Sequence, residues 1–127
     1  MTWEFGGTMS WVRVTLFPDG ERTTLELVHE ASLPPSMWEQ FGPGAAGVGW
    51  DLGLRGLGLY IESGVPVDPA TAVTFPASPL GAEFIRQAAA GWADAAVKDG
   101  VEAGQAHEAA ARTAAFYTGK PEAAPGN

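Results

Sequence analysis

The longest apolar segment of the chain is GPGAAGVGWDLGLRGLGLYIES, residues 42–63, and it is unusually rich in glycine. Its large apolar side chains recur at the spacing of one helical face: Trp50, Leu54, Leu57 and Ile61. This periodicity predicts a long buried helix from Gly44 to Ser63. We expect the rest of the chain to pack against that helix.

The glycines inside the predicted helix lead to a second prediction, which concerns what packs against it. They lie along its middle, at Gly49, Gly53, Gly56 and Gly58. Each costs about 1 kcal/mol relative to alanine in a helix interior, because glycine loses more backbone freedom on folding. We therefore expect a backbone or a ligand to approach this helix very closely, with the glycine face lying on a sheet.

Small residues at Ala45, Gly49 and Gly53 have the spacing at which membrane helices touch. However, Asp51 and Arg55 fall near the middle of the run, where a membrane-spanning helix is almost wholly apolar. These two charged residues stand four apart and are spaced to pair on the helix surface. The sequence therefore favours a helix laid across a sheet over a helix that spans a membrane.

The chain has 127 residues, 46% of them hydrophobic, which suits one domain with a modest core. Its formal charge of −8 disfavours nucleic acid and anionic membrane surfaces as partners. Because the sequence lacks cysteine, it has no disulfide, no thiolate nucleophile and no thiolate metal site. The first residues show no signal-peptide pattern, so we expect a cytoplasmic protein, and no cofactor is predicted.

Residues 2–31 have the period of two that is typical of β-strands. Two runs show it most clearly, Val12-Arg13-Val14-Thr15-Leu16 and Leu25-Glu26-Leu27-Val28-His29. The residues Pro18-Asp19-Gly20 suit a turn and predict a hairpin between these strands. Thr2 to Phe5 is expected to form a third strand, which Gly6-Gly7 ends.

The remainder of the chain predicts helices separated by prolines and glycines. A short helix is expected within residues 32–41, and several prolines in residues 64–77 predict a connecting loop. Ser78-Pro79 suits the start of a helix, with serine as the N-cap and proline at the first position. An alanine-rich last helix is expected from about Val101 to Thr118, and residues 120–127 are expected to form a flexible tail.

Residues with catalytic chemistry are few. Neighbours on a strand point to opposite faces, so His29 and Glu30 do not face one ligand together. We interpret His29 as a sheet residue that is satisfied locally or lines a cavity without chemistry, and His107 as a solvated helix residue. Without a Gly-x-Ser-x-Gly setting, a phosphate-binding loop or a multi-ligand metal motif, the sequence predicts neither a catalytic residue nor a metal site.

Tryptophan is frequent for a chain of this length. The five tryptophans are Trp3, Trp11, Trp38, Trp50 and Trp92. Two interpretations remain open, because these side chains suit either ordinary core packing or the walls of an apolar cavity.

Three segments resemble the SRPBCC, or START-like, superfamily. They are TTLELVHEA at residues 23–31, WEQFGPGA at residues 38–45 and GVGWDLGL at residues 47–54. The most similar branch is that of bacterial homologues of the heat-shock-protein ATPase activator, often grouped with polyketide cyclases. The resemblance covers residues 2–63 well and residues 78–119 more loosely.

The resemblance implies an α+β fold in which an antiparallel sheet curls around a long C-terminal helix, with an apolar ligand commonly held between them. No catalytic residue is shared across that family, so none is carried over. A complete member has further strands and helices before the segment that corresponds to Thr2, so this chain resembles the C-terminal half. We therefore expect a partial helix-grip over residues 1–63, a linker over 64–77 and two additional helices over 78–119, in one domain overall.

These observations favour a non-catalytic module that binds a small apolar ligand between the sheet and the long helix. The candidate ligand-binding residues are Trp11, His29, Trp50, Leu54 and Leu57. A structural or regulatory interaction protein, co-chaperone-like in its family version, is the alternative, and a cyclase-type enzyme comes third. Because three strands are too few to wrap such a helix, we also expect a homo-oligomer or a partner chain that completes the fold.

Overall fold

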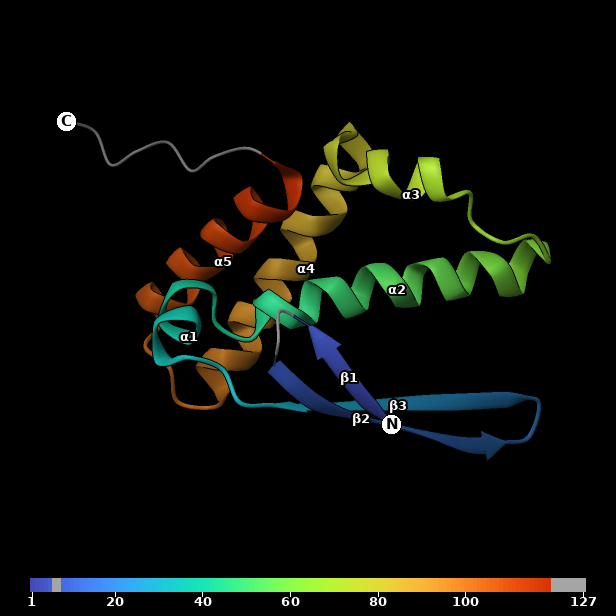
Figure 1. Ribbon diagram of the computed structural model, residues 1–127, viewed down its shortest axis with the longest axis horizontal. Helices are drawn as coiled ribbons and strands as arrows, with labels where there is room; N and C mark the ends of the chain where they lie inside the picture. The colour runs from blue at the N-terminus through green and yellow to red at the C-terminus, as the bar shows by residue number, and fades with distance from the viewer. Residues whose placement is uncertain (6–7, 120–127) are drawn as a thin grey trace. The chain divides into compact units, whose positions relative to one another are not determined.

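The computed structural model describes residues 1–5 and 8–119. These residues form a three-stranded antiparallel sheet and five α-helices, which confirms the predicted α+β class (Figure 1). The elements in chain order are β1 (Thr2–Phe5), β2 (Thr8–Asp19), β3 (Arg22–Ala31), α1 (Pro35–Phe41), α2 (Gly44–Ser63), α3 (Pro69–Thr74), the 3-10 helix η1 (Phe75–Ala77), α4 (Pro79–Lys98) and α5 (Ala103–Thr118). The strand end predicted at Gly6-Gly7 and the tail predicted at residues 120–127 lie outside the described residues.

The chain divides into two compact units, Met1–Pro34 and Pro35–Asn127. The first holds the strands and is called the sheet unit; the second holds the helices and is called the helical unit. Helix α2 packs with α1, α4 and α5, and the predicted grouping of α2 with the strands over residues 1–63 stays a prediction. Within the helical unit, the helices predicted as additions over residues 78–119 are the main packing partners of α2.

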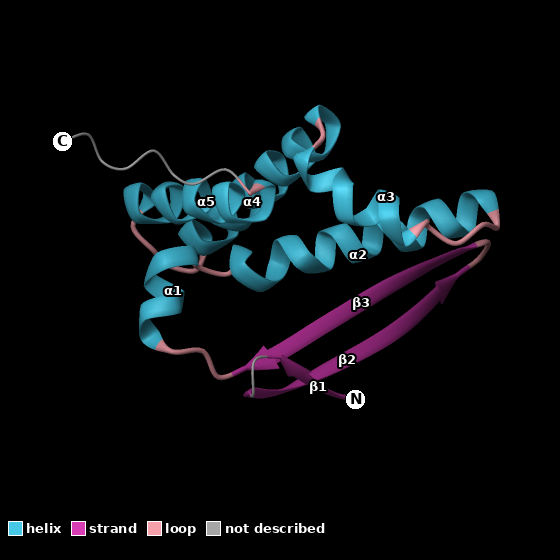
Figure 2. Ribbon diagram, turned by 45° about the horizontal axis from the view of Figure 1, so that its top comes forward, coloured by secondary structure: helices cyan, strands magenta, loops and turns pink. Residues whose placement is uncertain are grey.

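The sheet unit has the strand order β1-β2-β3 (Figure 2). β2 pairs with β3 from Ser10↔Ala31 to Asp19↔Arg22, whereas β1 pairs only with the first residues of β2. The register gathers an apolar set on one face of the hairpin: Val12, Val14, Leu16, Leu25 and Leu27. The period-two pattern therefore predicted the strands correctly.

The turn and the proline of the hairpin both follow from backbone geometry. Gly20 has a φ of 60°, and no described residue other than glycine has a positive φ, so Glu21 follows with a negative one. A two-residue loop of this kind is a type II′ turn, which suits the twist of the strands. Val12 N donates to Met1 O at 2.9 Å, so the backbone of Val12 faces the β1 side. Because residues of a strand alternate, the backbone of Pro18 also faces the β1 side. Strand β1 does not extend that far, so the missing N–H of proline costs no hydrogen bond of the sheet.

Helix α2 has the predicted bounds but packs through a different face from the predicted one. Three members of the predicted buried stripe, Leu54, Leu57 and Ile61, are 40%, 41% and 72% exposed. The residues that meet α4 and α5 are instead Gly44, Gly47, Val48 and Leu52. Small residues permit the closest approach of two helices, so α4 and α5 come nearest to α2 where it carries Gly44 and Gly47.

The indole of Trp92, on α4, lies across α2 at Gly47. A Cβ added at Gly47 would collide with the ring atoms of Trp92, so only glycine fits there. Trp92 Nε1 donates to Asp51 Oδ2 at 2.8 Å, one turn further along α2. Asp51 therefore bonds to α4 rather than forming the predicted pair with Arg55. The guanidinium of Arg55 lies 3.8 Å from the centroid of the Phe75 ring.

The glycines predicted to mark a close approach behave differently along α2. At Gly49 an added Cβ would stand 3.0 Å from Tyr117 Oη, which is a tight contact. At Gly53 and Gly58 an added Cβ meets no described atom within 4 Å. Of the four predicted glycines, only Gly49 therefore has a tight contact, and its neighbour is a side chain of α5 rather than a backbone or a ligand. That the glycine face lies on a sheet stays a prediction.

Side-chain caps explain where two of the helices start. Ser78 caps α4 as predicted, because its Oγ accepts a bond of 3.0 Å from Gly81 N. Residues 64–77, predicted as a loop, contain α3 and η1, which corrects that prediction. Asp68 caps α3 by accepting a bond of 3.3 Å from Ala70 N, and the proline after it occupies the first helical position. Prolines that indicated a loop thus begin short helices.

Helices α4 and α5 lie side by side through alanines (Figure 1). The buried alanines at this contact are Ala93, Ala96 and Ala106. Glu102 caps α5 by accepting bonds of 2.8 and 2.9 Å from Gly104 N and Gln105 N, and these bonds lower the pKa of its carboxyl. Gly119, with a φ of 70°, ends α5 after Thr118 as predicted.

Replacing Gly47 with alanine should destabilise the protein by about 1 to 3 kcal/mol, because the added methyl overlaps the Trp92 ring. The matched control is Gly53→Ala on the same helix, where the added methyl has open space. That variant should gain about 0.5 to 1 kcal/mol from helix propensity. Urea unfolding measures both values, and equal effects of the two substitutions would contradict the packing described for α2.

The carboxyl of Glu83, exposed on α4, should titrate far below its usual range. It accepts bonds from Arg86 Nε at 2.8 Å and Gln87 Nε2 at 2.9 Å, and these bonds lower its pKa from 4.5 to about 2. Because the folded-state pKa is depressed, the stabilisation is present above about pH 4.5 and is lost as the pH falls through about 2. Side-chain NMR should show the pKa rising in Arg86→Gln but not in the control Lys98→Gln; an unchanged value in both would refute the assignment.

Candidate functional site

The C-terminal end of α1 is held by side chains of α5. Thr113 Oγ1 donates to Phe41 O at 3.0 Å, while Arg112 donates from Nε to Gln40 O at 2.7 Å and from Nη2 to Glu39 O at 3.3 Å. Carbonyls in the last turn of a helix have no partner within it, and a cation near them also offsets the helix dipole. A helix of 7 residues, too short to be stable alone, is thereby fixed to α5.

Tyr117 makes an equivalent link to the first turn of α2. Its hydroxyl donates to Ala45 O at 2.6 Å. Burial raises the pKa of the Tyr117 phenol, so the group remains a proton donor at neutral pH. Together with the Arg112 and Thr113 bonds, this link sets α1, the turn to α2, and α5 around one hollow.

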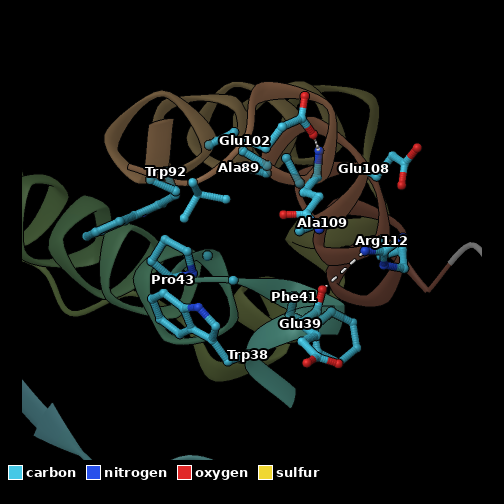
Figure 3. A pocket seen from close by; sticks show the side chains of 18 of the residues that line it. Trp38, Glu39, Phe41, Pro43, Ala89, Trp92, Glu102, Glu108, Ala109 and Arg112 are labelled. Atoms are coloured by element: carbon cyan, nitrogen blue, oxygen red, sulfur yellow. Dashed lines mark hydrogen bonds between the residues drawn. The ribbon is translucent and has the colours of Figure 1, made fainter. Parts of the chain in front are cut away.

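This hollow is a cleft of about 500 Å³ bounded by α1, the turn after it, α4 and α5 (Figure 3). Its small lining residues are Gly42, Gly44, Ala89, Ala93, Ala96, Gly100, Ala106, Ala109 and Ala110. Its large apolar lining residues are Trp38, Phe41, Pro43, Trp92 and Val101. Because alanine and glycine line so much of its wall, the space between the helices is not filled by their own side chains.

Polar groups of the cleft are few, and several already have partners. Glu102 caps α5, Arg112 bonds to α1, and the indole N–H of Trp92 donates to a carboxylate of α2. Glu39 and Glu108 add two further carboxylates to the lining. The cleft therefore combines apolar walls with three carboxylates, one guanidinium and the amide of Gln105, which suits a ligand with an apolar body and no acidic group.

A serine and a histidine meet in the sheet unit without the arrangement of a nucleophile and its base. Ser10 Oγ donates to Trp3 O at 2.9 Å, and His29 Nε2 lies 2.9 Å from Ser10 Oγ. A hydroxyl has one proton, so His29 Nε2 must donate in this bond and does not act as a base toward Ser10. His29 is thus a locally satisfied sheet residue, as predicted. Among the described residues, no three His, Asp or Glu side chains gather to hold a metal ion.

The predicted ligand-binding residues of the sheet unit lie on opposite faces. Trp11 pairs with Glu30, whereas His29 pairs with Val12, the next residue along β2. Successive residues of a strand alternate between faces, so one ligand on the sheet contacts Trp11 or His29 but not both. Which of them lines a site stays a prediction.

The predicted ligand-binding residues of the helical unit share a face of α2. Trp50, Leu54 and Leu57 follow the helical period, and Leu54 lies two turns after Gly47, on nearly the same side of the helix. The cleft is lined by other residues, so these three do not belong to it. Their part in ligand binding also stays a prediction.

Sequence reasoning did not single out the cleft, although two of the five tryptophans line it. Trp92 fits both interpretations that were left open, since it packs on the core of α2 and also lines a cavity. Trp38 stands on α1 and is 45% exposed. The alanine rows of α4 and α5 were a usable signal, because helices that meet through alanine leave room beside large aromatic side chains.

Comparison of the chain with protein-family models, curated proteins and solved structures finds no match. The START-like resemblance therefore stays a prediction. Among the helices formed by the described residues, none has both the length and the apolar character needed to cross a membrane.

Replacing Thr113, which is fully buried, with valine should destabilise the protein by about 1 to 3 kcal/mol, because it leaves the carbonyl of Phe41 without its donor. The matched control is Thr118→Val on the same helix, whose hydroxyl donates to Ala114 O, inside α5 itself. That change should cost about 0.5 kcal/mol or less. Urea unfolding compares the two, and amide exchange should quicken in α1 only for Thr113→Val. Equal losses would show that the link to α1 is unimportant.

Proposed function

We propose that this chain is a non-catalytic binding module that takes a small apolar ligand in the cleft between α1, α4 and α5. The observation that carries the proposal is the cleft itself, whose volume of about 500 Å³ falls within the range of small-molecule sites. Alanine, glycine and aromatic side chains form much of its wall, so a ligand with an apolar body gains burial against them.

Trp38 is the residue of the cleft best suited to contact a ligand. It is 45% exposed and stands on α1, whose end is fixed by α5, so its indole offers a positioned apolar surface. Trp92 is less free to adapt, because its ring lies across α2 and its N–H is bonded to Asp51. We expect ligand stacking at Trp38 and a rigid wall at Trp92.

The charged side chains that line the cleft restrict the kind of ligand that we propose. Three glutamates and one arginine line the cleft, and the arginine is already bonded to α1. A carboxylate or sulfonate entering there meets net negative charge, whereas a neutral or amine-bearing molecule does not. The proposed ligand is therefore a neutral or cationic molecule with an aromatic or aliphatic body.

The START-like resemblance supports a second placement for such a ligand. In a partial helix-grip the site would lie between the sheet and α2, with Trp50, Leu54 and Leu57 and one of Trp11 and His29 as its lining. Substitution separates the two placements, since no lining residue of the cleft belongs to this set.

Titration with the neutral fluorophore phenylnaphthylamine tests the proposal. Binding should be saturable and should weaken about tenfold, or 1.4 kcal/mol, in Trp38→Ala because the stacking surface is lost. Trp11→Ala, a matched removal of an exposed tryptophan from the sheet unit, should leave the affinity unchanged. The anionic probe anilinonaphthalene sulfonate should bind more weakly than the neutral one.

Two outcomes would count against the cleft. Affinity that survives Trp38→Ala but falls in Trp50→Ala would move the site to α2 and favour the helix-grip placement. No saturable binding by either wild-type protein or variants, with circular dichroism showing folded chains, would refute the ligand-binding function.

A further inference from the structure

Strand β3 is an outer strand of the sheet, and its free edge has a defined set of backbone groups. Because Val12 N bonds to Met1 O, on the β1 side, the alternate residues Trp11 and Arg13 face β3. Their pairing partners, Glu30 and Val28, face back toward β2. By the same alternation, every second residue of β3 directs its N–H and C=O groups outward, Thr23, Leu25, Leu27 and Ala31 among them.

This edge carries charged side chains at Arg22, Glu26 and Glu30, but it lacks three other features by which proteins usually prevent strand addition. Residues 22–31 contain neither proline nor lysine, and their pairing with β2 is continuous, without a bulge. The other edge is different, because β1 covers its first part and Pro18 interrupts its donors beyond that. Strand addition is therefore expected at β3 rather than on the β1 side.

The sequence of β3 is suited to pair with itself around a two-fold axis at Leu27. In that register Leu27 faces the partner's Leu27, Thr23 faces the partner's Ala31, and Leu25 faces the partner's His29. On the other face of the sheet, Glu26 stands opposite the partner's Val28. Every outward position of the strand is then paired, apolar side chains meet at the axis, and no like charges stand opposite each other.

Neighbouring registers are worse for electrostatic reasons. A shift of the axis to Glu26 sets this carboxylate directly against the partner's Glu26. A shift to Val28 sets Glu26 against the partner's Glu30 twice. Like charges directly opposite each other destabilise a strand pair, so side-chain charge favours the axis at Leu27 over both neighbouring axes.

We infer that two copies of the chain associate through antiparallel pairing of β3 with β3, centred on Leu27, to form one continuous six-stranded sheet. The occupant of the edge is a second copy because the strand complements itself in this register. The apolar faces of the two hairpins, with Leu25 and Leu27 of each copy at the centre, then lie on the same side of the sheet. This interaction surface is independent of the proposed ligand cleft in the helical unit.

Cysteine cross-linking tests the register, since the chain has no cysteine of its own. Leu27→Cys should form a disulfide-linked dimer on mild oxidation, because paired Cα atoms lie about 5.5 Å apart, within disulfide range. Thr23→Cys alone should not, since its two copies stand roughly 27 Å apart at 3.4 Å per residue. A mixture of Thr23→Cys and Ala31→Cys should cross-link. Equal cross-linking of Thr23→Cys and Leu27→Cys, or none in any variant, would overturn the proposal.

Sedimentation of the protein without cysteine provides the second measurement. The wild-type chain should have twice the monomer mass of 13.2 kDa at micromolar concentration. Leu27→Pro removes an outward N–H that β2 does not use, so this variant should fold and sediment as a monomer, while Leu27→Ala, the side-chain control, should still dimerise. A monomeric wild-type chain whose β3 amides exchange quickly would refute the pairing and leave the edge to an extended segment of another protein.

Discussion

The contact of the Trp92 indole with Gly47 is the constraint on which the helical unit depends. Only a residue without a side chain accepts the ring at that position, and the indole N–H is satisfied by Asp51 one helical turn away. The contact brings α4 against the backbone of α2, and beside it Val48 and Ile85 become fully buried. The core has few large side chains, so its close packing comes from helix backbones that lie near each other rather than from side-chain volume.

Small residues have a second consequence on the other side of α4. Alanines let α4 and α5 approach, yet they do not fill the space that α1 closes from the side, and the cleft remains. The walls of that cleft hold their shape because Arg112 and Thr113 bond to the end of α1. The small side chains that permit the helices to pack closely are therefore also the ones that leave space for the proposed ligand.

The sequence predicted most elements, and its errors share a physical cause. The strands, the span of α2 and the Ser78 cap depend on neighbours in sequence, so periodicity and capping chemistry were sufficient. The loop expected over residues 64–77 was wrong because Asp68 and the proline after it also form a helix start. The face on which α2 packs was missed because periodicity marked the leucine stripe, whereas the contact with α4 uses glycine.

By itself the sequence determined the features that depend on local interactions: the class of the fold, the alternating strands of the hairpin, the bounds of the long helix and the Ser78 cap that starts α4. Tertiary structure alone decided which glycine receives an aromatic ring, which carbonyls of α1 are bonded by α5, and that Trp38 and Trp92 line one cleft. These relations join residues as much as 73 positions apart, such as Glu39 and Arg112. Periodicity identifies a face of a helix but not the side chain that will occupy it, because that choice depends on volumes and hydrogen-bond partners supplied by another part of the chain.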